Sequence, residues 1–321
     1  MIGFPRFIRF DPPLTQAGKP SFMLRMFKSY APYEVLAAPG REKPEIWRLV
    51  VGIVLCLIVM IAGQGILIAI YGFALGSHGE AMMQMGLLDT PGAMIAALLG
   101  IACFIPGVML VLRWLHKRRF WGVIGDPVRT LKLGARVAAY AAAIQLLLML
   151  PAVFFAEEEL ILNTPPMQWL VLLPIGALVV LLQTSAEEIF FRGYIQSQMA
   201  ARFQNPIIWM GIPAIIFAIG HYAAVMYGDN AAMVAVWAGL FGLLAADLTA
   251  RTGSLGPAMG LHFMNNALVI LFVSMDGPMS GLSLYVLPFS AQDAEEVAKV
   301  MPLDFVALGV SWLAARVAVR A

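Results

Sequence analysis

Residues 169–192 read WLVLLPIGALVVLLQTSAEEIFFR, an apolar run that leads directly into Glu187, Glu188 and Arg192. A helix of about 20 mostly apolar residues is long enough to cross the hydrocarbon core of a bilayer. A charged side chain at that depth costs about 3 kcal/mol or more, so intramembrane carboxylates are rare and usually functional. The stretch therefore predicts a membrane-spanning helix that carries part of a functional site.

The composition of the chain is that of a membrane protein. Of its 321 residues, 61% are hydrophobic and 12% are charged, whereas about half and about a quarter are usual in soluble domains. Apolar runs close to spanning length occur at roughly 48–72, 93–114, 133–155, 168–190, 206–225, 231–250, 254–275 and 301–318. Lipid offers no hydrogen-bond partners to an open strand edge, so each run is expected to be helical. We predict an all-α, polytopic membrane helix bundle of about eight transmembrane helices.

The charged residues between these runs indicate the orientation of the bundle, because loops rich in Lys and Arg remain in the cytoplasm. Basic residues precede the first run and fill the loop between the second and third: Arg6, Arg9, Lys19, Arg25, Lys28, Arg41, Lys43, Arg48, Arg113, Lys117, Arg118, Arg119, Arg129, Lys132 and Arg136. The alternate loops contain one lysine, Lys299, and many acids: Glu80, Asp89, Glu157, Glu158, Glu159, Asp229, Asp276, Asp293, Glu295 and Glu296. Both termini are predicted to be cytoplasmic, in an integral, multi-pass protein of the cell's inner (plasma) membrane.

The predicted organisation is an N-terminal segment followed by one bundle. Residues 1–47 precede the first run, and residues 48–321 form the transmembrane bundle. The stretch Phe22–Tyr33 mixes basic with large apolar residues, which fits a helix in the plane of the headgroups and equally a disordered basic tail. Cys56 and Cys103 both lie in apolar runs and are expected to be packing residues.

Glu187 and His221 are predicted to lie at the same depth in the membrane. The helices over 168–203 and 206–225 form a hairpin that turns near residue 204. Each of the two residues is about 17 positions from that turn, or about 25 Å at the rise of a helix. The two side chains can therefore touch.

His262 and Asn266 are predicted to join them. They lie about 12 to 18 Å along the helix that begins after the turn at 251–254. They share one face of that helix, because they are four residues apart. His78 and His116 are expected in loops and receive no role.

The two adjacent glutamates are expected to differ in role, because neighbouring helical residues point about 100° apart. Glu188 and Arg192 are four residues apart with the acid first, which favours an ion pair. We predict a structural role for that pair and a chemical role for Glu187. Asp247 and Arg251 have the same spacing and are also expected to pair.

A carboxylate and an imidazole beside a wet pocket can activate a water molecule. An asparagine amide and a second histidine can stabilise the oxyanion that forms on an attacked carbonyl. Glu187, His221, His262 and Asn266 thus suggest hydrolysis of a peptide bond without a covalent nucleophile. Glu187, His221 and His262 are equally a possible zinc ligand set with an open position for water, although no HExxH motif is present. Metal dependence stays open.

Three motifs of this chain resemble those of a known family. EEIFFRG (187–193), FAIGH (217–221) and HFMNN (262–266) are similar to the EExxxR, FxxxH and HxxxN/B motifs of the CAAX prenyl endopeptidase and bacteriocin-processing (CPBP) family of intramembrane proteases. They occur in the family's order on three separate predicted spans. The stretch RTGSLGPAMGLH (251–262) also resembles the usual approach to the last motif. The resemblance covers about 168–275, which would be the catalytic core.

The resemblance implies an eight-helix fold with a catalytic cavity open to the cytoplasm. Glu187 would be the general base, His221 would help to activate water, and His262 with Asn266 would form the oxyanion site. Phe217 would fill the aromatic position of the second motif. Eukaryotic members cleave the last three residues from prenylated proteins, so the implied partner is a peptide or protein substrate, with or without a lipid, and not a nucleic acid.

Two other functions remain open. One is a non-enzymatic membrane protein, such as an immunity protein, that binds a peptide in the same cavity. The other is a proton-coupled transporter that uses Glu187 as its relay, although the sequence lacks the interrupted repeat helices typical of transporters.

Overall fold

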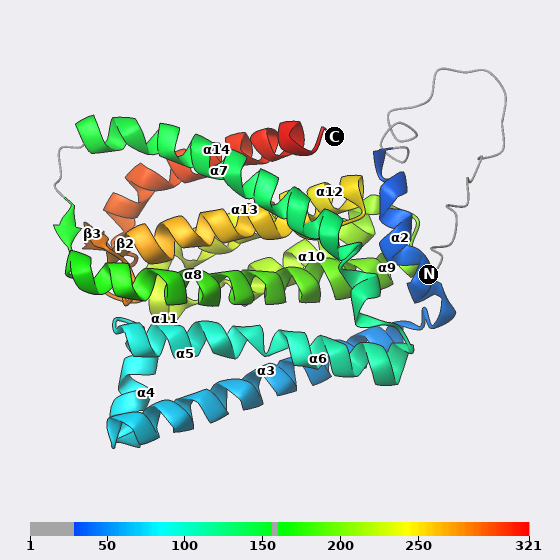
Figure 1. The fold of residues 1–321 in the computed structure, drawn as a ribbon, viewed down its shortest axis with the longest axis horizontal. Coiled ribbons are helices and arrows are strands. Elements are labelled where there is room, and N and C mark those ends of the chain that lie inside the picture. Colours follow the sequence, from blue (N-terminus) through cyan, green and yellow to red (C-terminus); the bar gives the residue numbers. More distant parts are fainter. Residues whose placement is uncertain (1–28, 156–159, 321) are drawn as a thin grey trace.

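Long helices make up almost the whole of the structure, a computed structural model that describes residues 29–155 and 160–320. The longest helices run side by side along the long axis of the molecule (Figure 1). Helix α2 (Glu34–Ala37) and the end of α14 (Ala294–Val319) lie at one end of this bundle, and a small sheet lies at the other. The protein has the expected all-α, polytopic membrane fold.

Within the described residues, six helical stretches are long and apolar enough to cross a membrane: Ile46–Leu75, Pro91–His116, Pro127–Leu148, Pro166–Arg202, Ala224–Thr252 and Ala294–Val319. Two shorter apolar helices are Pro206–Gly220 and Gly256–Phe272. These eight stretches coincide with the eight apolar runs of the sequence. The number of true spans and the side on which the termini lie stay predictions.

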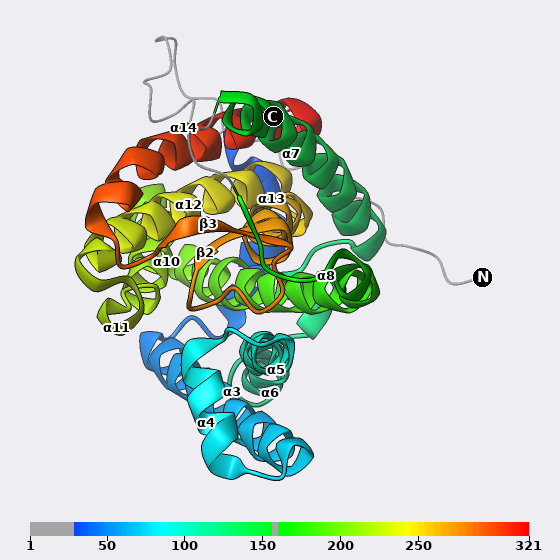
Figure 2. The same cartoon turned by 90° about the vertical axis from the view of Figure 1, so that its left-hand side faces the viewer.

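The first helices form a layer of their own. Helix α3 (Ile46–Leu75) packs against α4 (His78–Leu87), α5 (Pro91–Ala102) and α6 (Phe104–Val111), and Figure 2 shows these four beside the rest of the bundle. Only 6% of the most apolar window of α3 is buried inside the protein. A helix that is apolar all round and yet uncovered needs lipid as its surroundings. Helix α4 was not among the predicted elements.

Helix α13 (Gly256–Ala267) lies in the middle of the bundle, against α7 (Pro127–Phe155), α8 (Pro166–Glu188) and α12 (Ala231–Thr252). Its two glycines allow the close approach to α7. A Cβ atom on Gly256 would overlap the carbonyl oxygen of Thr130, and one on Gly260 would overlap that of Gly134. Small residues four apart are a common device for close helix packing in membranes.

The hairpin predicted near residue 204 is present. Helix α8 continues through a π-helical stretch, η5 (Ile189–Gln196), into α9 (Ser197–Arg202). Helix α10 (Pro206–Gly220) then begins where Asn205 accepts a hydrogen bond from the backbone of Ile207 and proline occupies the first turn. Helix α10 packs along α12 and ends one residue before His221.

A three-stranded sheet is a second part of the fold that the sequence did not predict. Strand β3 (Tyr285–Ser290) pairs antiparallel with β1 (Ile161–Leu162) and parallel with β2 (Val273–Asp276). The seventh predicted run extends to residue 275, but its helix ends with the π-helical stretch η7 (Leu268–Phe272) and the chain becomes extended. The strands are short and lie at the end of the bundle (Figure 1), so they do not cross a bilayer.

Part of the N-terminal segment packs onto the bundle. The first seven residues of the proposed interfacial stretch Phe22–Tyr33 lie outside the described residues. The Tyr33 ring is buried and stacks on Trp209 at 5.2 Å, and the Tyr30 hydroxyl donates to Asp247 at 2.8 Å. Burial raises the pKa of both tyrosine hydroxyls. At its described end, the segment is therefore neither a free tail nor a detached surface helix.

Arg118, which the sequence analysis placed among the loop cations, is buried at the end of the bundle where α2 lies. Its guanidinium donates to the backbone of Leu36 at 2.8 Å and to the hydroxyl of Ser197 at 3.1 Å. Burial lowers the pKa of this guanidinium to about 10. Arg118 thus joins the N-terminal segment to α9 instead of facing solvent.

Candidate active site

Both glutamates lie at the end of α8, immediately before the helix becomes π-helical. Such π-helical turns within α-helices occur frequently at functional sites. Both side chains point inward: Glu187 is 8% exposed and Glu188 is completely buried. Uncompensated carboxylates in such surroundings are costly, so the partners of each glutamate define the site.

Glu188 is held by two partners. Its Oε1 atom accepts a hydrogen bond from Nη1 of Arg192 at 2.9 Å and contacts Nδ1 of His262 at 2.7 Å. The ion pair expected between Glu188 and Arg192 is therefore present. The contact with His262 was not expected, and it means that Glu188 is not confined to pairing with Arg192.

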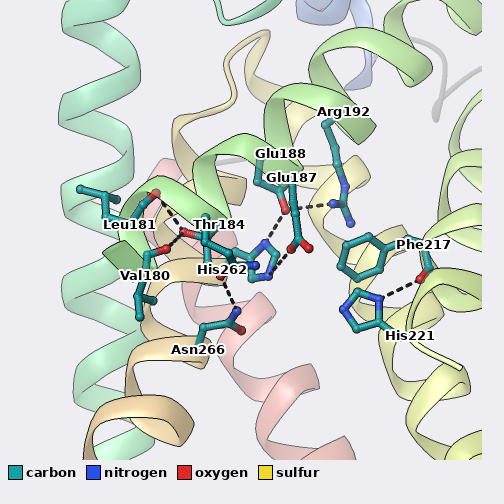
Figure 3. A network of polar contacts seen from close by, with 11 residues as sticks. Val180, Leu181, Thr184, Glu187, Glu188, Arg192, Phe217, His221, His262 and Asn266 are labelled. Atoms are coloured by element: carbon teal, nitrogen blue, oxygen red, sulfur yellow. Dashed lines mark hydrogen bonds and ion pairs between the residues drawn. The ribbon is translucent and has the colours of Figure 1, made fainter. Parts of the chain in front are cut away.

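His262 lies between the two glutamates. Its Nδ1 faces Glu188, and its Nε2 is 3.4 Å from Oε2 of Glu187 (Figure 3). A carboxylate can only accept, so Nδ1 is the donor in the shorter contact. The ring also lies against Phe241, with ring centroids 4.6 Å apart. Arg192, Glu188, His262 and Glu187 thus form one continuous polar chain from α8 and η5 to α13.

Three phenylalanines surround the guanidinium of Arg192. Its Cζ atom lies 4.7 Å from the ring centroid of Phe217, 5.6 Å from that of Phe241 and 5.8 Å from that of Phe191. Aromatic faces attract a cation most strongly when water is absent, and Arg192 is 1% exposed. The rings fix the position of Arg192 and, through it, that of Glu188.

His221 is in the neighbourhood of this chain but does not belong to it. Among the described residues, no hydrogen bond or ion pair joins His221 to Glu187, so the direct contact expected from matched depth is not made. The Nδ1 atom of His221 instead contacts the carbonyl oxygen of Phe217 at 2.8 Å, and the two rings lie 4.2 Å apart. Because α10 ends at Gly220, the imidazole folds back onto its own last turn.

That local bond determines the direction of the His221 ring. A carbonyl oxygen only accepts, so Nδ1 carries the proton, and Nε2 of the neutral ring is an acceptor. Figure 3 shows this second nitrogen pointing toward the side on which Glu187 and Asn266 lie. Phe217 contacts both histidines, since its ring centroid is 6.1 Å from that of His262. It therefore joins α10 to the chain of polar residues.

Asn266 lies one turn beyond His262 on α13. Its Nδ2 atom donates to Oε1 of Gln183 at 3.1 Å. Gln183 is 4% exposed and lies one turn before Glu187 on α8. Sequence analysis missed this residue, although its spacing of four from Glu187 on one helix face could have indicated it. The amide of Asn266 keeps a second N–H for another acceptor.

The remaining sequence predictions around the site have mixed outcomes. Asp247 and Arg251 form the expected ion pair at 2.8 Å. Neither His78 nor His116 is in a loop, because His78 is the first residue of α4 and His116 ends a π-helical turn. His116 is 1% exposed, and its Nε2 contacts the hydroxyl of Tyr194 at 2.9 Å. Tyr194 lies two residues after Arg192, so His116 supports the helix that carries the glutamates.

The proposed zinc ligand set is not assembled. Across residues 29–155 and 160–320, no group of three or more His, Cys, Asp or Glu side chains could hold a metal ion. The Nδ1 atom of His221 faces a carbonyl, and that of His262 faces Glu188. Each Nδ1 is held by an oxygen of the protein, which leaves the Nε2 atom of each ring as the one that could bind a metal ion or a water molecule. The structure shows no assembled ligand set among the described residues, we derive no step through a metal, and metal dependence stays open.

Comparison with known proteins bears on the same part of the chain. Residues 167–268 match the family model described as type II CAAX prenyl endopeptidase Rce1-like. The resemblance is confirmed over this segment. The Rce1-like segment contains all three motifs and every residue of the polar chain, together with Gln183. This segment is thus similar to intramembrane CAAX-type proteases, and the apolar helices make the protein an integral, multi-pass membrane protein.

One relative among curated proteins extends beyond the Rce1-like segment. The uncharacterized protein YyaK of Bacillus subtilis is 27% identical over 183 residues, which cover 55% of this chain and 60% of that protein. The chain thus spans less than two thirds of the length of this relative. No solved structure matches the chain.

Proposed function

We propose that this protein is an intramembrane endopeptidase in which Glu187 activates a water molecule for attack on a peptide bond. The observation that carries the proposal is the buried chain of Arg192, Glu188, His262 and Glu187 inside the Rce1-like segment. Glu187 is the carboxylate of this chain for which the described residues supply no hydrogen-bond donor. Its Oε2 is buried and has only the 3.4 Å ion-pair contact with Nε2 of His262, whereas Glu188 accepts two hydrogen bonds through Oε1 and leaves only its Oε2 unpaired. Water is the natural partner of such an atom.

Glu187 is the proposed general base and takes a proton from that water. His221 is the proposed second contact of the water, since its Nε2 can accept a hydrogen bond while Nδ1 donates to the carbonyl of Phe217. Two acceptors, a carboxylate and an imidazole nitrogen, orient a water molecule with its oxygen lone pair directed away from both. That lone pair attacks the carbonyl carbon of the substrate.

His262 and Asn266 are the proposed donors to the oxyanion. The two residues lie one turn apart on the same face of α13, so their polar atoms face a common space. When His262 is protonated, Nδ1 donates to Glu188 and Nε2 is available to a developing negative charge. Asn266 contributes the N–H that is not bound to Gln183. Donors in place before the reaction lower its barrier most effectively where water is excluded.

Glu188 and Arg192 are proposed to position His262 without touching the substrate. The carboxylate orients the ring through Nδ1, and Arg192 balances the charge of that carboxylate. A carboxylate that orients an imidazole in this way stabilises the imidazolium without taking its proton. In this proposal the pair keeps the structural role expected from the sequence and in addition orients an active-site histidine.

The test is Glu187→Gln, which keeps the shape of the side chain and removes the base. Purified variant and wild-type proteins would be incubated with a fluorogenic peptide library in detergent, with prenylated and unmodified versions of each peptide. We expect the rate of cleavage to fall by about 100-fold or more, the usual contribution of a general base. The matched control is Glu295→Gln, which changes an exposed glutamate in the first turn of α14.

Cleavage by the Glu187→Gln variant at the wild-type rate would refute the assigned mechanism. The absence of cleavage by a folded wild-type protein over the whole library would favour the peptide-binding alternative. Response of substrate uptake to a pH gradient in proteoliposomes would indicate the transporter. A difference between prenylated and unmodified peptides would decide whether a lipid is part of the substrate.

A further inference from the structure

A second polar site lies away from the glutamates, at the end of the bundle that holds α2 and the end of α14. It is a pocket of about 330 Å³ between the first turns of α7 and the last turns of α12 and α14. Its side chains are both basic and apolar, and include Arg129, Leu133, Arg251, Val319 and Arg320. The sequence analysis used Arg129 only as a cation that sets the membrane orientation, and Arg251 as the partner of Asp247.

The three arginines come from three different helices and give the pocket an excess of positive charge. The charge of Arg251 is balanced by Asp247, to which its Nε atom donates at 2.8 Å. Arg129 and Arg320 are exposed, and neither side chain has an ion pair within the part of the chain that the structure describes. Two guanidinium charges therefore remain without a counter-charge.

The helix ends around the pocket do not cancel this charge. Each helix terminus carries about half an elementary charge, positive at the start of α7 and negative at the ends of α12 and α14. Their sum is about −0.5, against about +2 from the two unbalanced arginines. Residues 1–28 are no source of acids either, because they contain five basic residues and a single acid, Asp11. Asp126 is the acid nearest in sequence to Arg129, whose backbone N–H donates to its Oδ1 at 2.7 Å, but Asp126 does not line the pocket. The pocket thus keeps a net positive charge, which favours the binding of an anion.

We propose that this arginine pocket binds the phosphate group of an acidic phospholipid in the leaflet that this end of the bundle faces. Guanidinium groups match the geometry of phosphate oxygens and can bind them in pairs. The pocket lies where the apolar helix α7 begins and where α12 and α14 end. The ends of membrane-spanning helices are expected near the lipid headgroups, and basic pockets between such helices bind headgroups on the cytoplasmic side.

The apolar residues of the pocket favour a lipid over free phosphate. Leu133 lies one turn from Arg129 on α7, and Val319 precedes Arg320 on α14, so each unbalanced arginine has an apolar neighbour in the same wall. An inorganic phosphate ion would gain no binding free energy from contact with these apolar side chains. A phospholipid can place its phosphate between the arginines and the start of its acyl chains against Leu133 and Val319.

The experiment compares lipid binding by the detergent-purified full chain and by the double variant Arg129→Gln/Arg320→Gln, using native mass spectrometry. The probes are phosphatidic acid, phosphatidylcholine and inorganic phosphate, each added alone. Each arginine near a phosphate contributes about five-fold in affinity, from about 1 kcal/mol per charge. We expect phosphatidic acid to bind the variant about 30-fold more weakly than the wild type, and phosphatidylcholine to bind both proteins weakly. Arg251 is left unchanged because its loss would also leave Asp247 without its ion-pair partner.

The control is Arg113→Gln/Arg119→Gln, which removes two exposed arginines from the same end of the bundle but outside the pocket. It should bind phosphatidic acid as the wild type does. Arg129→Lys/Arg320→Lys keeps the charges and should restore most of the binding. Equal losses in the pocket and control variants, or no loss in either, would overturn the proposal. Inorganic phosphate bound as tightly as phosphatidic acid would overturn the assignment to a lipid.

Discussion

Glu188 and Arg192 were correctly paired from their spacing, but the consequences of the pair depend on burial. In the structure both side chains are enclosed, and the aromatic rings of Phe191, Phe217 and Phe241 leave the guanidinium no access to water. Replacing a buried ion pair by apolar or neutral groups is often tolerated, whereas the loss of one partner strands a charge. In this pair, loss of Arg192 would leave the carboxylate of Glu188 buried without its counter-charge.

Arg192→Met is therefore expected to destabilise the protein by about 3–5 kcal/mol, the usual cost of a buried charge without its partner. The double variant Glu188→Gln/Arg192→Met should recover most of that stability, because position 188 then carries no charge that has lost its partner. Thermal unfolding in detergent measures both. Equal melting temperatures for the single and double variants would show that the pair does not work as a unit.

Gln183 is expected to act on catalysis through Asn266. Gln183→Leu removes the acceptor of the 3.1 Å hydrogen bond and leaves the amide of Asn266 free to rotate. We predict a fall in kcat of about ten-fold with little change in KM, because an oxyanion donor acts in the transition state. Steady-state kinetics on a cleaved peptide measures this split.

The neighbouring Thr184→Val is the control for that prediction. The Thr184 hydroxyl is buried and donates to the backbone of Val180 in its own helix, so its loss should leave kcat unchanged. Gln183→Glu keeps an acceptor for Asn266 and should retain more activity than Gln183→Leu. A change in KM with constant kcat would assign Gln183 to substrate binding instead.

At the scale of the elements, the site depends on how closely α13 approaches α7 and α8. Helix α13 carries His262 and Asn266, and its position is determined by backbone contacts at Gly256 and Gly260. The GxxxG spacing is visible in the sequence, but the partner helix is not. Only the structure identifies α7 as the surface against which these glycines lie.

Gly260→Ala is expected to push α13 away from α7, because the new methyl group would overlap the carbonyl oxygen of Gly134. Overpacking of this kind costs about 1–3 kcal/mol and should lower both the melting temperature and the rate of cleavage. Gly309→Ala in α14 is the matched control, since a Cβ atom there has open space around it. Equal effects of the two substitutions would mean that the contact with α7 is not limiting.

At the scale of the whole molecule, the distribution of charge predicts that the loop between α6 and α7 faces the cytoplasm and the loop before α14 faces the other side. In a background with Cys56→Ala and Cys103→Ala, a membrane-impermeant maleimide added to intact cells should label Gln292→Cys and spare Trp121→Cys. Both positions are exposed in the structure. Labelling of both in permeabilised cells provides the control, and the reverse pattern in intact cells would invert the topology.

The sequence alone determined the class of fold, the approximate positions of the long helices and the Glu188–Arg192 pair, because hydrophobic length and helical spacing are local properties. The tertiary structure decided which side chains the polar residues of these helices contact. His262 contacts both glutamates, His221 turns to its own helix, Gln183 holds Asn266, and three arginines from distant helix ends share one pocket. Depth along a helix follows from counting residues, but the rotation of each helix about its axis does not. That rotation is set by the packing of side chains from segments far apart in the chain, so the partners of each polar group emerge only in the folded protein.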